Sequence, residues 1–230
     1  MNPEIINQAF GLKFNNFSPD LLQTEETINA VFVLDVSPSM DENNAIGELN
    51  NAYNDFIQEM QKSHISDRLM VSNIEFCETV EVVHGFRPVK DVQPISLHTK
   101  GVATALFDAT KAGLKNAIDY REQLEKTGVT CKTLLFIITD GEDNRSGRRS
   151  AEEVKEMIVN FKKEEKNAFT FTSILFGIGD DNSFTAAKDA MGIEILATLG
   201  KTAKEIRKMI NFISSSISSS ASGVAVSTNF

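Results

Sequence analysis

The chain has 230 residues, of which 41% are hydrophobic and 24% are charged, and its 32 acidic against 23 basic side chains give a net charge of −9. A chain of this size and composition can bury a full hydrophobic core, which excludes a wholly disordered protein. The acidic excess argues against binding to nucleic acid or to an anionic membrane surface, because both depend on basic side chains.

Cysteine usage and the N-terminal sequence bear on the compartment. The two cysteines, Cys77 and Cys131, each lie in an apolar stretch, where a thiol usually behaves as a small buried hydrophobe, so no disulfide framework is expected. The N-terminal residues lack the basic start and apolar run of a secretory signal, and the longest apolar runs are too short to cross a bilayer. We therefore expect a cytoplasmic protein that does not associate with a membrane.

Short β-rich runs alternate along the chain with longer amphipathic segments. In chain order we expect a strand at 30–34, a helix around 46–60, strands at 69–76 and 79–83, a helix over 105–125, a strand at 134–138, a helix around 154–161, a strand at 169–176, a short helix over 183–190, a strand at 193–197 and a last helix around 206–217. This alternation is typical of a parallel sheet with helices packed on its faces.

The spacing and composition of the strands predict how they pair. The runs 30–34 and 134–138 are apolar without alternation, as expected of central strands that are buried on both faces. Only two residues separate 69–76 from 79–83, too few for a crossover helix, so these strands should form an antiparallel hairpin. The sequence predicts an α/β protein with a six-stranded, mainly parallel sheet, one antiparallel edge strand and helices on both faces.

The two ends of the chain fall outside this scheme, which places one domain at residues 28–216. Residues 1–27 contain apolar side chains without a clear period and are interpreted as an N-terminal arm that packs on the domain or binds a partner. Eight of the last twenty residues are serine. We therefore interpret residues 217–230 as a serine-rich flexible tail.

Polar residues follow two of the apolar strands and open one helix. Asp35, Ser37 and Ser39 follow the first strand, Asp140 ends the strand at 134–138, and Thr104 lies just before the helix over 105–125. Ligands of open parallel sheets bind beyond the carboxyl ends of the strands. Two carboxylates and three hydroxyl groups are hard oxygen donors, which suit Mg²⁺ or Mn²⁺ and lack the thiol or imidazole that favours zinc.

Each of these residues alone has an ordinary structural explanation, since serine, threonine and aspartate commonly cap helices and close turns. Their coincidence at one edge of one sheet favours a metal site. A basic cluster, Arg145, Arg148 and Arg149, follows Asp140 in the same loop. It is interpreted either as a charged helix start or as a surface that holds an acidic partner.

The same residues resemble the metal-ion-dependent adhesion site of von Willebrand factor type A domains, of the bacterial or intracellular type. The family motif Asp-x-Ser-x-Ser matches Asp35, Ser37 and Ser39, its threonine matches Thr104, and its last aspartate matches Asp140. The resemblance implies a three-layer, doubly wound, Rossmann-like fold. It also implies that these five residues hold a Mg²⁺ or Mn²⁺ ion, with one coordination position left for an acidic side chain of a partner.

The function that the resemblance implies is a noncatalytic, Mg²⁺-dependent protein interaction module, an adaptor or regulatory subunit. Intracellular members of the family act beside AAA-type ATPases or in stress-response assemblies, and such a partner is expected here. One alternative is a metal-dependent phosphatase or phosphotransferase, but that chemistry needs a second carboxylate two residues after the nucleophilic aspartate, where this chain has Ser37. The other alternative is a surface adhesin, which the missing secretory signal disfavours.

Overall fold

The computed structural model describes residues 12–163, 170–179, 183–227 and 230. The elements in chain order are η1 Pro19–Leu21, β1 Glu26–Asp35, η2 Pro38–Asn44, α2 Ala45–Lys62, β2 Leu69–Phe76, β3 Val80–Pro88, η3 Val89–Asp91, α3 Leu106–Lys126, β4 Thr130–Thr139, α4 Ser150–Lys163, β5 Phe171–Ile178, α5 Ser183–Met191, β6 Ile195–Leu199 and α6 Ala203–Ala221. The elements labelled η are short 3₁₀ helices. Within the described residues, no helix combines the length and the apolar character needed to cross a membrane.

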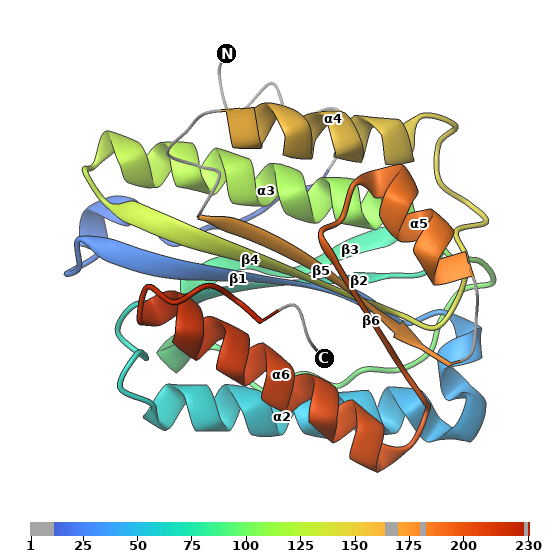
Figure 1. Ribbon diagram of the computed structural model, residues 1–230. Coiled ribbons are helices and arrows are strands. Elements are labelled where there is room, and N and C mark those ends of the chain that lie inside the picture. Colours follow the sequence, from blue (N-terminus) through green and yellow to red (C-terminus); the bar gives the residue numbers. More distant parts are fainter. Residues whose placement is uncertain (1–11, 164–169, 180–182, 228–229) are drawn as a thin grey trace.

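The described residues form three layers, with the sheet in the middle (Figure 1). Helices α2 and α6 cover one face of the sheet, and α3, α4 and α5 cover the other. The strand order is β3-β2-β1-β4-β5-β6, with β2 and β3 antiparallel and every other neighbouring pair parallel. The prediction of a six-stranded doubly wound sheet with one antiparallel edge strand is therefore confirmed.

The central strands β1 and β4 contribute side chains to a separate core on each face. On the side of α2 and α6, the ring of Phe32 lies 5.1 Å from that of Tyr53 and 5.3 Å from that of Phe136. On the opposite side, the rings of Phe86 and Tyr120 stack at 4.6 Å. Because both faces of these strands are buried, their apolar residues follow one another without alternation.

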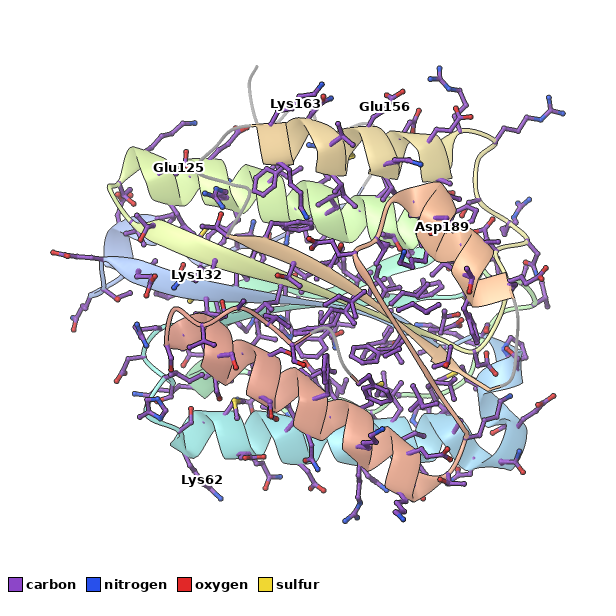
Figure 2. The ribbon with its side chains drawn as sticks, in the orientation of Figure 1. Lys62, Glu125, Lys132, Glu156, Lys163 and Asp189 are labelled. Atoms are coloured by element: carbon purple, nitrogen blue, oxygen red, sulfur yellow. The ribbon has the colours of Figure 1, made fainter. Side chains whose placement is uncertain are left out.

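The observed strands differ in length from the predicted ones. β1 begins at Glu26 and β4 at Thr130, so both start before their apolar runs, and β3 continues to Pro88. Thr27 and Asn29 of β1 are buried as well, but they are polar, so the apolar run that hydropathy detects starts only after them. On the outer layers, charged side chains such as Lys62 and Glu156 point away from the sheet (Figure 2).

Both ends of the described chain contact the domain. In the N-terminal arm, the main-chain N–H of Phe17 donates to the carbonyl of Phe86 at 2.6 Å, and Phe17 packs against the core on the α3 side. At the other end, α6 continues to Ala221, within the stretch that the sequence analysis assigned to the tail. The ring of Phe230 lies 6.0 Å from that of Phe176.

Gly177 of β5 offers a test of how tightly α5 packs on the sheet. A Cβ atom at this position would lie 2.2 Å from the ring of Phe184, which is buried in α5. We expect Gly177→Ala to lower the free energy of unfolding by about 2 kcal/mol, the usual range for overpacking a core. Urea unfolding measures this change. Gly141→Ala is the control, because its Cβ would meet the nearest atom only at 3.9 Å; equal stability of the two variants would contradict the prediction.

Candidate metal site

Asp35 is the last residue of β1 and is fully buried. Its Oδ1 atom accepts a hydrogen bond from the main-chain N–H of Ser37 at 2.8 Å, and its Oδ2 atom accepts one from the Thr139 hydroxyl at 2.5 Å. Thr139 ends the neighbouring parallel strand β4. The two strand ends are therefore joined through the Asp35 carboxylate.

The two serines that follow Asp35 continue this network toward Asp140. The hydroxyl groups of Ser37 and Ser39 lie 3.2 Å apart, and the Ser39 hydroxyl donates to Oδ1 of Asp140 at 2.6 Å. Ser37 and Asp140 are buried and Ser39 is half-buried. The buried side chain of Met40 anchors the loop directly after the serines. The structure thus brings Asp35, Ser37, Ser39 and Asp140 together.

Thr104 joins the region through its main chain. Its N–H donates to Oδ1 of Asn144 at 2.8 Å, and the N–H of Asn144 donates to the carbonyl oxygen of Thr104 at 3.0 Å. Asn144 lies in the loop that begins with Asp140, so this reciprocal pair fixes the start of α3 against the end of β4. In the part of the chain that the structure describes, no hydrogen bond links the Thr104 hydroxyl to the other four side chains.

The loop between β4 and α4 is attached to the first turn of α3 by side chains from both segments. Oδ1 of Asp143 accepts from the N–H of Phe107 at 3.2 Å, and Oδ2 of Asp108 accepts from the N–H of Gly147 at 3.3 Å. Asp108 also accepts a hydrogen bond from the Ser150 hydroxyl at the start of α4. The loop therefore presents its exposed residues, Arg145, Arg148 and Arg149, on a fixed main chain.

Burial dominates the electrostatics of the site. Desolvation raises the pKa of Asp35 from 3.8 to about 6; the hydrogen bonds from Ser37 and Thr139 oppose this shift, and the nearby charge of Asp140 adds to it. The side chain of Asp140 is also fully buried, but it forms an ion pair with Lys201. Partial burial of Lys201 lowers the pKa of its ammonium group, its hydrogen bonds to Asp140 and Glu42 raise it, and the net pKa lies above the usual value.

The chemistry of this donor set fits a hard divalent cation. No group of three or more His, Cys, Asp or Glu side chains within the described ranges is arranged to hold a metal ion, so such an ion would depend on hydroxyl oxygens here. Ser37, Ser39 and Asp140 offer two hydroxyl groups and a carboxylate in direct contact. The buried Asp35 carboxylate has an elevated pKa, which means that its ionised form lacks a compensating positive charge. A cation at this point would supply that charge.

Sequence reasoning did not identify three residues that complete the local network. Thr139 had a weak signal, since it is a hydroxyl residue at the end of an apolar run. Lys201, from the loop before α6, places its Nζ atom 2.9 Å from Oδ2 of Asp140 and 2.9 Å from Oε2 of Glu42. Neither Lys201 nor Glu42 belongs to a local pattern, because they approach Asp140 only through the tertiary fold.

The chain is thus a doubly wound α/β protein with clustered oxygen donors at the carboxyl edge of its sheet. The model of the von Willebrand factor type A domain family matches residues 29–188, well over half of the sequence. The chain therefore belongs to the von Willebrand factor type A domain family. No curated protein sequence matches it significantly.

Several solved structures share this fold. Proximal thread matrix protein 1 from the mussel byssus is 16% identical, with a TM-score of 0.54 over 82% of this chain and 47% of its own; the same protein has been solved with a zinc-occupied MIDAS motif. The pilus adhesin SpaC from Lactobacillus rhamnosus GG is 13% identical, with a TM-score of 0.60 over 85% of this chain and 31% of its own. The ArnB paralog VWA2 from Sulfolobus acidocaldarius is 14% identical, with a TM-score of 0.53 over 81% of this chain and 45% of its own. The present chain spans less than half the length of these structures, and at these identities the likeness concerns the fold alone.

Proposed function

We propose that this protein is a Mg²⁺-dependent protein interaction module of the bacterial or intracellular type, with Mn²⁺ as an alternative ion. Its family consists largely of noncatalytic binding domains that depend on a metal. In this proposal the protein acts in the cytoplasm as an adaptor or regulatory subunit. The expected partner presents an acidic side chain, and an AAA-type ATPase or a stress-response assembly is the kind of partner to test first.

The observation that carries this proposal is the continuous network from Asp35 through Ser37 and Ser39 to Asp140. These residues lie at or just after the ends of two adjacent strands, and hydrogen bonds of 2.6 to 3.2 Å link them, the first from the main-chain N–H of Ser37 to Asp35 and the others between side chains. An uncompensated buried carboxylate next to two hydroxyl groups is costly in an interior without a cation. A metal-binding role accounts for this arrangement.

In the proposed site, the residues have different roles. The hydroxyl groups of Ser37 and Ser39 would be direct ligands, whereas both oxygens of Asp35 already accept hydrogen bonds and would act on the ion through water. Asp140 and Thr104 complete the set, Asp140 by charge and Thr104 by its hydroxyl. A bound divalent ion would supply Lewis acidity for a carboxylate of the partner.

Exposed arginines near the candidate site support an acidic partner. Arg145 and Arg148 are exposed on the loop that Asn144 ties to Thr104. In a chain with a net charge of −9, they place positive charge beside the candidate site. Complementary charge at the rim of an interface increases the rate of association and selects the partner.

The test is capture of partners from cytoplasmic extract on the immobilised full chain in the presence of Mg²⁺. We expect Asp35→Ala and Thr104→Ala to abolish capture of the specific partner, and a chelator to do the same, while the far-ultraviolet circular dichroism spectrum stays unchanged. Thr130→Ala, at the opposite end of β4, is the matched control and should retain capture. Capture that survives both substitutions and the chelator would refute the metal-bridged mechanism. Phosphatase activity of the purified protein with Mg²⁺ would instead support the enzymatic alternative.

A further inference from the structure

Lys201 is held in place at the edge of the candidate site. It lies between the end of β6 and the first turn of α6, and the next residue, Thr202, caps α6 by accepting a hydrogen bond from the N–H of Glu205. The Cε atom of Lys201 would lie 3.5 Å from a Cβ atom at Gly179, so the side chain passes close over the end of β5. Only 17% of the Lys201 side chain is exposed. Its position is therefore defined by the fold.

The ammonium group of Lys201 contacts two carboxylates of different exposure. Nζ lies 2.9 Å from Oδ2 of Asp140, whose side chain is 0% exposed, and 2.9 Å from Oε2 of Glu42, whose side chain is 70% exposed. Asn43 and Asn44, directly after Glu42, both adopt the left-handed conformation, with φ of 54° and 57°. These two residues turn the chain from Glu42 into α2, which fixes the main chain that carries Glu42.

Asp140 divides its two oxygens between Lys201 and the serines. Oδ1 accepts the hydrogen bond from Ser39, and Oδ2 accepts the one from Lys201. A cation held beside Ser39 and the Lys201 ammonium group would therefore draw on the same negative charge. Two positive charges separated by a single carboxylate repel each other, and their buried surroundings weaken the screening by solvent.

We propose that Lys201 is an internal counter-ion that neutralises Asp140 in the metal-free protein and thereby lowers the affinity of the site for divalent cations. The inference rests on the metal site proposed above and deepens it by naming the residue that sets the ion affinity. Glu42 is the second carboxylate that pairs with Lys201. When a divalent ion takes up the charge of Asp140, Glu42 remains as the partner of Lys201.

The experiment is isothermal titration of Mg²⁺ and Mn²⁺ into the full chain and its variants at one pH and one ionic strength. Lys201→Gln removes the competing charge and keeps a long polar side chain. We expect it to bind both ions about tenfold more tightly, and the metal-free variant to melt about 2 °C lower, because the ion pair with Asp140 is lost. Lys201→Arg keeps the charge and should bind with nearly the wild-type affinity. Lys204→Gln, an exposed lysine of the first turn of α6, is the matched control for net charge.

A double-mutant cycle tests the role of Glu42. Glu42→Gln removes the second partner of Lys201 and should weaken ion binding more than Asp41→Asn does, since Asp41 is the exposed carboxylate next to it. In the Lys201→Gln background, the two substitutions should have equal effects. An excess effect of Glu42→Gln that persists without Lys201 would contradict the proposed exchange of partners.

The outcomes separate this inference from the proposed function. Wild-type binding combined with an unchanged or weaker affinity in Lys201→Gln would overturn the counter-ion role and leave the metal site standing. A wild-type chain that binds neither Mg²⁺ nor Mn²⁺ would overturn the metal site, and the counter-ion role would fall with it. The melting temperatures of the metal-free variants supply a readout that does not require any ion to bind.

Discussion

Replacing Asp35 with asparagine is expected to stabilise the metal-free protein by about 2 kcal/mol near neutral pH, because a fully buried carboxylate with a raised pKa is costly to ionise. Burial raises the pKa of Asp35 to about 6, so the side chain is mostly charged at neutral pH. Asparagine keeps the shape and accepts the Ser37 N–H bond without the charge. Urea unfolding in the presence of a chelator measures the difference. A variant less stable than the wild type would contradict the desolvation argument.

The pH dependence of this difference gives an independent check. The folded pKa of Asp35, about 6, lies above the ordinary aspartate value of 3.8, so the folded state holds a proton more readily than the unfolded state does. Relative to Asp35→Asn, the wild type should therefore gain stability as the pH falls through about 6 and should have recovered the full difference below about 4. Burial lowers the pKa of His84, which destabilises the fold in acid, but this effect is common to both proteins and cancels in the comparison.

The same substitution, which stabilises the metal-free protein, should weaken ion binding. We expect Asp35→Asn to lower the affinity for Mg²⁺ or Mn²⁺ about 100-fold, because the neutral amide no longer balances the charge of the ion. Wild-type affinity should also fall when the pH drops below about 6, since protonation of Asp35 removes the negative charge that balances the ion. The ionised Asp35 would then destabilise the metal-free fold and strengthen ion binding, a combination that is common at functional sites.

The fold was largely predictable because its main determinants are local. The apolar runs around Phe32 and Phe136 have no alternation, and this pattern correctly predicts central strands that are buried on both faces. The short connection between β2 and β3 leaves room only for an antiparallel hairpin, which is observed. Strand ends were less well predicted, because Glu26 and Thr130, which pair at the start of β1 and β4, are polar and lie outside the apolar runs.

The candidate site was predictable to the extent that its residues follow strand ends. Asp35, Ser37, Ser39 and Asp140 have this property, and the structure brings them into one network. Thr139 and Asn144 support them but are ordinary residues in the sequence. Lys201 lies more than sixty residues after Asp140 and meets it only because β5 and β6 extend the sheet next to β4. Such long-range ion pairs depend on the assembled fold, and no local periodicity reports them.

Removing both hydroxyl groups of the Asp-x-Ser-x-Ser motif should separate ion binding from folding. We expect the double variant Ser37→Ala and Ser39→Ala to bind Mg²⁺ about 100-fold more weakly than the wild type, because the remaining carboxylates cannot replace two hydroxyl ligands at once. The metal-free protein should lose only about 1 kcal/mol, since Asp140 loses the hydrogen bond from Ser39 but keeps its ion pair with Lys201. The two hydroxyl groups would then contribute more to ion affinity than to the stability of the metal-free fold.

The measurement is the shift in melting temperature on adding Mg²⁺, followed by titration calorimetry. Wild-type protein should melt at a higher temperature with the ion, because a ligand that binds only the folded state stabilises it, and the double variant should show no shift. Ser215→Ala, an exposed serine of α6, is the control and should behave as the wild type does. An equal shift in the double variant would place the ion elsewhere on the protein. In that case the hydrogen bonds from Ser37 to Ser39 and from Ser39 to Asp140 would have a structural role, namely to hold the loop after β1 against the end of β4.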